Sequence, residues 1–116
     1  MCCNCGIIMQ YDKRYLIKKI IQYMNENYMN AISLEMISNY IHLNPIYLSK
    51  LFKEETGESP INYLIGIRLY KAKELLDNGE FTVKEIASMV GYDDPYYFSK
   101  LFKKYYGCSP KKYKNK

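Results

Sequence analysis

The sequence predicts an all-α fold of about seven helices, in which a pair of helices joined by a short turn occurs twice. The main observation is a repeat: PIYLSKLFKEETGESP, which begins at Pro45, and PYYFSKLFKKYYGCSP, which begins at Pro95, are identical at ten of sixteen positions. Helix-boundary residues recur at the same points of both copies. Apolar residues follow a helical period, and no segment shows the alternation typical of a strand. Two copies are too few for a stacked repeat array, so we interpret them as two uses of one motif.

The first predicted element is an amphipathic helix from Asp12 to Tyr28. Leu16, Ile20 and Met24 recur every four residues and define one apolar face. Residues 1–11 are predicted to be a tail, or a remnant of a linker from a longer protein. They contain an apolar patch without a basic region before it, which is not typical of a signal peptide.

The first copy reads as two helices joined by a turn of about three residues. Ser33 is the predicted N-cap of a helix over 34–41, and Asn44-Pro45 opens the second helix as cap and first residue. Gly57 is predicted to end that helix. Its inward face is predicted to carry Leu48, Leu51 and Phe52.

The second copy repeats this pattern with stronger signals. Thr82 and Glu85 have the spacing of a capping box, and Gly91 is predicted to close that helix. Asp94-Pro95 opens the next helix, and Gly107 ends it. The predicted inward residues of that helix are Phe98, Leu101, Phe102 and Tyr105.

A further helix is predicted after each copy, because Ser59-Pro60 and Ser109-Pro110 repeat the cap-and-proline signal. The first of these helices runs from Pro60 to Asp77 and would be about 27 Å long at 1.5 Å per residue. After the second copy only the short run PKKYK remains for a helix.

The charge of the chain is concentrated at one end. Met1 to Asp94 carries 10 basic and 12 acidic residues, whereas Pro95 to Lys116 carries seven Lys and no acidic residue. Such a polycation favours a polyanionic partner. For the last four residues alone, a solvated, frayed tail is the favoured interpretation.

The run ASMVGYDDPYYFSKLFKKYYGCSPKKY, from Ala87 to Tyr113, resembles the signature of the AraC/XylS family of bacterial transcription regulators. IRLYKAKELL, from Ile67 to Leu76, resembles the central helix of that family. The resemblance implies two helix-turn-helix subdomains, 12–59 and 80–116, joined by one long linker helix, 60–79. It also implies sequence-specific binding of double-stranded DNA to control transcription. The first copy departs from the family pattern at its turn, where Ile41 stands in place of Gly91.

The outward stripe of the second helix in each copy supplies the candidate DNA-binding residues, since such a stripe is what a major groove meets. Lysine can donate to guanine O6 and N7, serine can serve several bases or a phosphate, and an apolar side chain can pack on a thymine methyl. The positions also match those that contact bases in the family. They are Ile46, Ser49, Lys50 and Lys53 in the first copy, and Tyr96, Ser99, Lys100 and Lys103 in the second.

Two other classes of function remain open at this point. A helical protein-interaction module could dock its basic end on an acidic partner, or Cys2, Cys3 and Cys5 could sense oxidation or a soft metal on the same scaffold. A zinc site needs four ligands, and the nearest candidates are Cys108 and His42, far along the chain. We therefore expect no metal and no cofactor, and an ordinary tail.

No catalytic constellation or phosphate-cradling glycine loop occurs, so we expect no enzymatic activity. No apolar run approaches the length of a membrane span, and we expect no membrane partner. The expected location is the cytoplasm, associated with the nucleoid. The isolated domain is expected to be monomeric, with RNA polymerase as a further partner of a regulator. Arg68 is predicted to pair with a nearby carboxylate, the alternative being a DNA phosphate.

Overall fold

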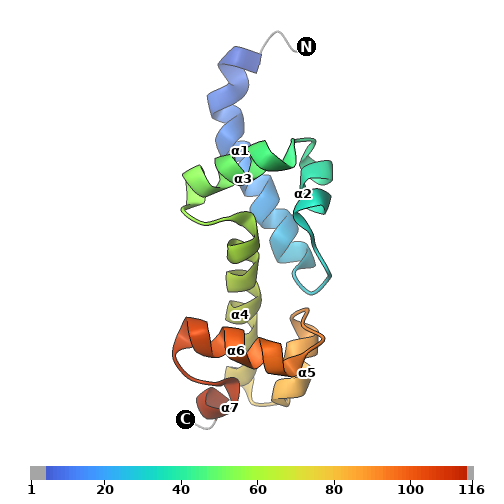
Figure 1. The fold of residues 1–116 in the computed structure, drawn as a ribbon, viewed down its shortest axis with the longest axis vertical. Coiled ribbons are helices and arrows are strands. Elements are labelled where there is room, and N and C mark those ends of the chain that lie inside the picture. The colour runs from blue at the N-terminus through green and yellow to red at the C-terminus, as the bar shows by residue number, and fades with distance from the viewer. Residues whose placement is uncertain (1–4, 115–116) are drawn as a thin grey trace. The chain divides into compact units, whose positions relative to one another are not determined.

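The computed structural model describes residues 5–114, with side chains from residue 13 onward. Within these residues the chain forms seven α-helices and no strand, as predicted (Figure 1). The helices are α1 (Cys5–Asn27), α2 (Leu34–Ile41), α3 (Pro45–Thr56), α4 (Pro60–Asn78), α5 (Val83–Met89), α6 (Pro95–Tyr106) and α7 (Pro110–Lys114).

The start of α1 differs from the prediction. The helix begins at Cys5 rather than Asp12, because the prediction followed the apolar stripe, whereas a helix continues as long as nothing breaks its backbone. Cys2 and Cys3 of the predicted thiol cluster lie outside the described residues, and Cys5 contributes only its backbone to the description.

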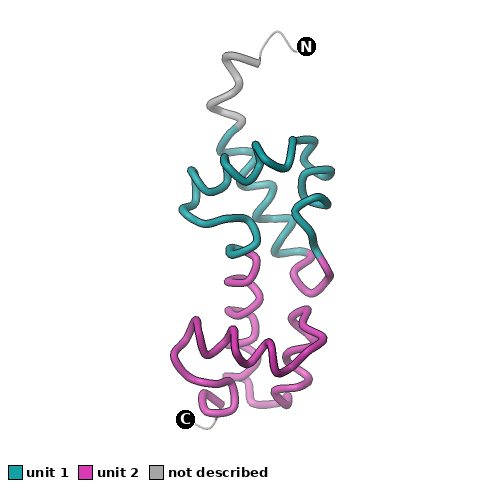
Figure 2. The backbone as a smooth tube through the Cα atoms, in the orientation of Figure 1, with its two compact units in different colours: residues 1–26, 32–63 teal, residues 27–31, 64–116 magenta. Residues whose placement is uncertain are grey.

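The chain divides into two compact units, shown in two colours in Figure 2. Unit 1 comprises residues 1–26 and 32–63, and unit 2 comprises residues 27–31 and 64–116. The helix α4 is continuous across the boundary at residue 63. Unit 1 therefore contains the first copy of the repeat, and unit 2 contains the second.

Most buried apolar residues of unit 1 come from three helices, with Pro60 of α4 buried as well, and α2 contacts α3 directly. The predicted inward face of α3 is confirmed, since all three of its expected residues are buried. The buried set is Ile17, Ile20 and Met24 of α1, Ile37 and Ile41 of α2, and Leu48, Leu51 and Phe52 of α3.

Unit 2 has a core rich in aromatic rings. Phe102 lies at its centre, with ring centroids 4.8 Å from Tyr106 and 5.8 Å from Tyr113. The buried members are Leu69, Ala72, Leu76, Ile86, Ala87, Val90, Tyr92, Phe98 and Phe102, with Leu101 partly buried against them. The prediction that Tyr105 points inward is wrong, because Tyr105 is 43% exposed and Tyr106 packs on the core instead.

Most helix ends follow the residues that predicted them, although α1 ends at Asn27 rather than Tyr28 and α4 at Asn78 rather than Asp77. The Asn44 and Asp94 side chains accept hydrogen bonds from the backbone N–H of Ile46 and Tyr96 at 2.8 and 3.0 Å. The capping box of Thr82 and Glu85 is complete. These local bonds satisfy amide groups that a helix N-terminus leaves unpaired, and they set the direction in which α3 and α6 begin.

The two turns between paired helices are built differently. In unit 2 the left-handed residue is Gly91, at φ 101°, and the Tyr92 N–H donates to Ala87 O at 2.8 Å. In unit 1 the left-handed residue is His42, at φ 62°, and the Leu43 N–H donates to Ser38 O at 3.0 Å. Both turns close with the same six-residue bond, which is that of a Schellman motif. The first copy uses a histidine one position later than the glycine of the second.

Candidate nucleic-acid interface

The predicted stripe of α3 lies on the surface of unit 1. Ile46 is 80% exposed, and Lys50 and Lys53 are also exposed. Ser49 is partly buried and lies beside the buried residues Leu48 and Leu51 of the same helix. An isoleucine this exposed contributes little to the fold, and such a side chain is available for contact with a partner.

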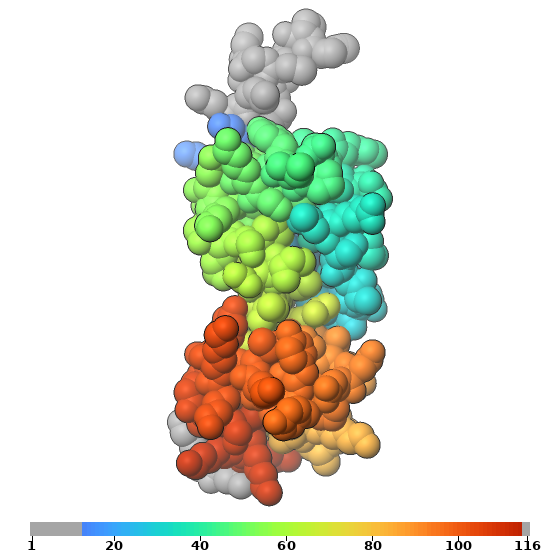
Figure 3. All heavy atoms as spheres, viewed as in Figure 1, coloured from blue at the N-terminus to red at the C-terminus, as the bar shows by residue number. Residues whose placement is uncertain are grey.

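The stripe of α6 has the same arrangement on unit 2. Tyr96 is 70% exposed, Lys100 and Lys103 are exposed, and Ser99 is partly buried. The ammonium of Lys100 lies 5.0 Å from the centroid of the Tyr96 ring, within the range of a cation–π contact. Atoms of α6 occupy much of the visible face of unit 2 in Figure 3.

Beside each stripe lies an exposed tyrosine that was not predicted as a DNA-binding residue. Tyr47 and Tyr97 are 40% and 50% exposed and follow Ile46 and Tyr96 directly. The signal was present, since both copies have tyrosine at this position. On a helical wheel this position lies next to the stripe and not on it, so it was not predicted. The exposed surface at a helix N-terminus is wider than one stripe.

The surfaces beside the two stripes differ in charge. In unit 1 the residues after Lys53 are Glu54 and Glu55, both exposed. In unit 2 the equivalent positions carry Lys104 and Tyr105, and α7 adds Lys111 and further lysines. A positive field next to the α6 stripe attracts a polyanion more strongly than the mixed charges beside α3.

The short helix α7 packs as part of unit 2. The Tyr113 hydroxyl donates to Asp77 Oδ1 at 2.8 Å, and Lys114 Nζ donates to the Phe81 carbonyl at 2.7 Å. The bond to Asp77 raises the pKa of the Tyr113 phenol above its usual range. The lysines of α7 therefore belong to a helix that packs on unit 2 along its whole length, from Pro110 to Lys114.

Arg68 does not form the predicted ion pair. Its Nε donates to the Tyr28 carbonyl and its Nη2 to the Asn30 carbonyl, both at 2.7 Å. Its guanidinium carbon also lies 5.2 Å from the centroid of the Tyr92 ring. Every residue has a backbone carbonyl, so the residue types do not indicate which carbonyl accepts a hydrogen bond from Arg68. Within the protein, the sequence therefore suggested only carboxylates as partners.

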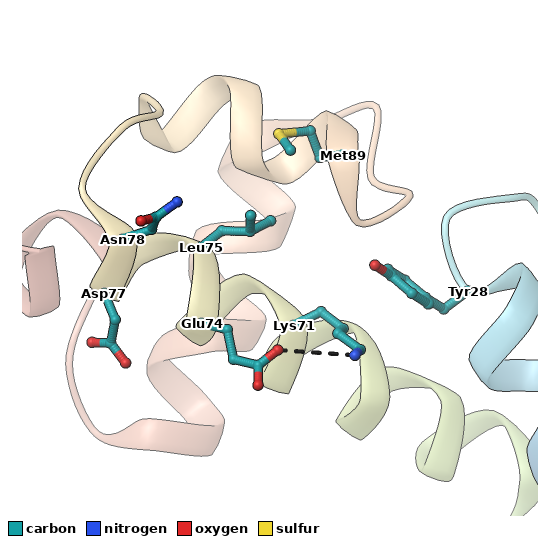
Figure 4. A pocket seen from close by; sticks show the side chains of 7 residues that line it. All are labelled: Tyr28, Lys71, Glu74, Leu75, Asp77, Asn78 and Met89. Atoms are coloured by element: carbon teal, nitrogen blue, oxygen red, sulfur yellow. Dashed lines mark ion pairs between the residues drawn. The ribbon is translucent and has the colours of Figure 1, made fainter.

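A hollow of about 600 Å³ lies on unit 2, away from the stripe of α6 (Figure 4). The ion pair between Lys71 and Glu74, at 3.9 Å, lies at its edge. None of the predicted DNA-binding residues lines it. The lining residues are Tyr28, Lys71, Glu74, Leu75, Asp77, Asn78 and Met89.

Over residues 5–114, no helix combines the length and apolar character that crossing a bilayer requires. Among residues 13–114, whose side chains are described, there is no cluster of three or more His, Cys, Asp or Glu residues suited to a metal ion. His42 lies in the α2–α3 turn and is exposed. The surface features that remain are the capped helices α3 and α6 with their lysine and serine side chains. These groups bind partners by hydrogen bonds and charge.

Two turn-linked helix pairs, each with an exposed polar stripe on its second helix, define a helix-turn-helix protein. Comparison with known proteins agrees: the family model described as "Helix-turn-helix domain" matches residues 37–116. The chain belongs to this family, and it is an AraC-type DNA-binding domain, homologous to the AraC family of transcription regulators. This is a family of DNA-binding regulator domains and not of enzymes.

The HTH-type transcriptional regulator YdiP of Escherichia coli strain K12 is 40% identical over 102 residues, which cover 88% of this chain and 34% of that protein. The chain thus spans about a third of the length of this relative.

Among solved structures, the C-terminal domain of AraT, a response regulator from Geobacillus stearothermophilus, is similar with a TM-score of 0.83 and 39% identity, covering 86% of this chain and 84% of that one. The DNA-binding domain of AdpA, solved in complex with a target DNA, shares the fold with a TM-score of 0.81 at 22% identity, covering 85% and 89% of the two chains.

Proposed function

We propose that this domain binds a specific sequence of double-stranded DNA with two recognition helices, α3 and α6, and thereby regulates transcription in the bacterial cytoplasm, at the nucleoid. The observation that carries the proposal is the matched pair of exposed stripes. On each helix an N-cap fixes the start, apolar residues anchor one face, and Ser and Lys occupy the other. A helix that presents such a face can enter a major groove.

The residues of each stripe have separate roles in this proposal. Lys50 and Lys100 donate to guanine O6 and N7, and Ile46 and Tyr96 pack against thymine methyl groups near the helix N-termini. Lys53 and Lys103, one turn further along, lie toward the backbone and contact phosphates. Ser49 and Ser99 donate to a base edge or to a phosphate, which their partial burial favours because it restricts their rotamers.

One chain with two readers can cover two half-sites without forming a dimer. The helix α4 has 19 residues, about 28 Å at 1.5 Å per residue, and is continuous. Successive major grooves on one face of DNA are about 34 Å apart. We therefore propose that a monomer covers an asymmetric site with half-sites about 10 base pairs apart. Engagement of both helices bends the duplex toward the protein, at a cost on the order of 1–6 kcal/mol.

A regulator with this output domain also meets the transcription machinery, and we propose RNA polymerase as its protein partner. The hollow of α4 and α5 does not contain the DNA-binding stripe, so a protein could contact unit 2 there while α6 reads DNA. A pull-down of RNA polymerase by the DNA-bound domain tests this part, with an excess of free domain as competitor.

Selection of bound sequences from random duplexes tests the function itself. We expect enrichment of one site, a gel shift that survives non-specific competitor, and an affinity that falls steeply with salt. Binding without enrichment, or no binding to any duplex, would leave the second class of function, a helical module that docks an acidic protein.

A further inference from the structure

Arg68 connects α4 to a segment far away in the sequence. Residues 27–31 follow α1, and two of their carbonyls, those of Tyr28 and Asn30, accept hydrogen bonds from Arg68. The Asn30 N–H donates to the Asn27 carbonyl at 2.9 Å, so the segment forms a turn that presents both carbonyls. A planar guanidinium with several donors in a fixed fork suits this double contact, whereas a lysine would make only one such bond well.

The same arginine lies against the turn of the second helix pair. Its guanidinium covers Tyr92, and a Cβ placed on Gly91 would lie 2.9 Å from the Tyr28 carbonyl oxygen and 3.2 Å from Arg68 Nε. The α5–α6 turn, α4 and the 27–31 segment therefore meet at Arg68. Burial raises the pKa of the Tyr92 phenol, and the nearby guanidinium partly offsets that effect.

The course of the chain gives this contact a consequence. Residues 27–31 belong to unit 2, but the chain on both sides of them belongs to unit 1, where it forms α1 and α2. The units are therefore joined by covalent connections on both sides of this segment as well as through α4. Because Arg68 bonds the 27–31 segment, the chain has a second anchor on unit 2 besides α4.

We propose that Arg68 is a positioning residue that sets the spacing at which the two recognition helices read DNA. The proposal rests on the proposed function, since it concerns the distance between two half-sites. With the 27–31 segment held, only one half-site spacing is bound tightly. Without that contact, several spacings are bound with similar affinity.

The test uses the full chain and a duplex that it selects from random sequence. Affinity is measured for that duplex and for versions with one, two and five base pairs inserted between the half-sites, and for each half-site alone. For wild type we expect a sharp maximum at the selected spacing. For Arg68→Met we expect unchanged affinity for single half-sites, and a reduction of about tenfold in the preference for the selected spacing over one extra base pair, the ratio that one charged hydrogen bond represents.

Two further variants separate positioning from simple loss of structure. Lys71→Met removes a charge one turn further along α4. The Lys71 ammonium lies 6.0 Å from the centroid of the Tyr28 ring, but the carbonyls of the segment are bonded by Arg68. The Lys71→Met variant should therefore keep the spacing preference. Arg68→Lys should restore part of the preference, because its ammonium can still donate to one of the two carbonyls. If Arg68→Met does not fold, as judged by circular dichroism, the comparison of Arg68→Lys with wild type decides the question in the same way.

Hydrogen exchange provides the structural readout. Arg68→Met should increase amide exchange at Asn30 while leaving the amides of Phe98 and Phe102 protected. If a folded Arg68→Met protein keeps the spacing preference of wild type, the positioning role is overturned. The reading of DNA by two helices stands in that case, because wild type still prefers one spacing. A wild type that accepts the five-base-pair insertion overturns instead the reading by two helices, so the two failures are distinguishable.

Discussion

The two copies of the repeat agree where a helix begins and ends and differ in what lies beside the recognition helix. Both have an Asn or Asp cap, a proline at the first position and a left-handed glycine at the end of that helix. Past Lys53 the first copy continues with Glu54 and Glu55, whereas past Lys103 the second continues with Lys104 and Tyr105. The residues that set the helix boundaries are therefore independent of the charge around the recognition helix, because the boundary residues are retained while that charge changes sign.

Their cores differ as well. At the positions of Leu48 and Thr56 in unit 1, unit 2 has Phe98 and Tyr106, and these rings pack around Phe102. Thr56 instead donates its hydroxyl to the Phe52 carbonyl at 2.8 Å. The last side chain of the helix thus packs on the core in unit 2 (Tyr106) and makes a hydrogen bond to its own helix in unit 1 (Thr56).

The largest expected effect is on the stability of unit 2. Phe102→Ala removes a fully buried ring and should lower the free energy of unfolding by about 3–5 kcal/mol. Tyr105→Ala, at the exposed position first expected to face inward, should cost below about 1 kcal/mol. Urea denaturation followed by circular dichroism measures both. Equal losses would mean that Tyr105 belongs to the core after all.

The next effect concerns the charge difference between the copies. Replacing Lys103, Lys104, Lys111 and Lys112 by Gln should flatten the plot of log affinity against log salt by up to about 0.9 for each phosphate that is no longer neutralised. The same change at Lys50 and Lys53 should flatten it less. Fluorescence anisotropy with one duplex over a range of salt concentrations gives the slopes. The reverse ranking would contradict the assignment of non-specific attraction to unit 2.

A third effect concerns one base contact. Lys100→Ala leaves the core intact, so thermal stability should remain nearly unchanged. The free-energy preference of this variant for the contacted base pair over other base pairs should fall by about 1–3 kcal/mol. Lys50→Ala should relax the preference at a different position. Affinities for single-base variants of the selected site measure this. Uniform weakening on all variants would make Lys100 a phosphate contact, and a large loss of stability would contradict its exposed position.

The smallest effect concerns the two turns. His42 is the non-glycine residue with positive φ in the described chain, a conformation that costs L-residues roughly 1–2 kcal/mol. His42→Gly should therefore raise the free energy of unfolding by at most about 1 kcal/mol, because glycine's extra freedom in the unfolded state offsets part of the gain. His42→Ala keeps the Cβ and should give no gain. A loss in His42→Gly would indicate that the imidazole makes a stabilising contact.

Much of the fold was predictable because its signals are local. Caps, prolines and glycines fixed the bounds of α2, α3, α6 and α7, since each acts within one turn of its own helix. The exposure of Lys50 and Lys100 also followed from helical periodicity. The inward residue at the end of α6 did not follow, because Tyr105 and Tyr106 both lie near the stripe, and only the structure shows that Tyr106 packs on the core.

The partners of Arg68 were beyond sequence reasoning for a different reason. They are main-chain carbonyls 38 and 40 residues away, and any residue type supplies a carbonyl. Long-range contacts of this kind depend on how the chain returns to itself, which no local pattern records. The DNA contacts of the eight stripe residues stay predictions that mutagenesis can test one at a time.

The central claim is that one chain reads DNA twice, once with each copy. Inserting five base pairs between the half-sites of the selected duplex tests it most directly, because half a helical turn moves one half-site to the opposite face of the DNA. We predict that the affinity falls to that of a duplex carrying a single half-site. Unchanged affinity for the spaced duplex would contradict the claim and would mean that only one of the two helices reads DNA.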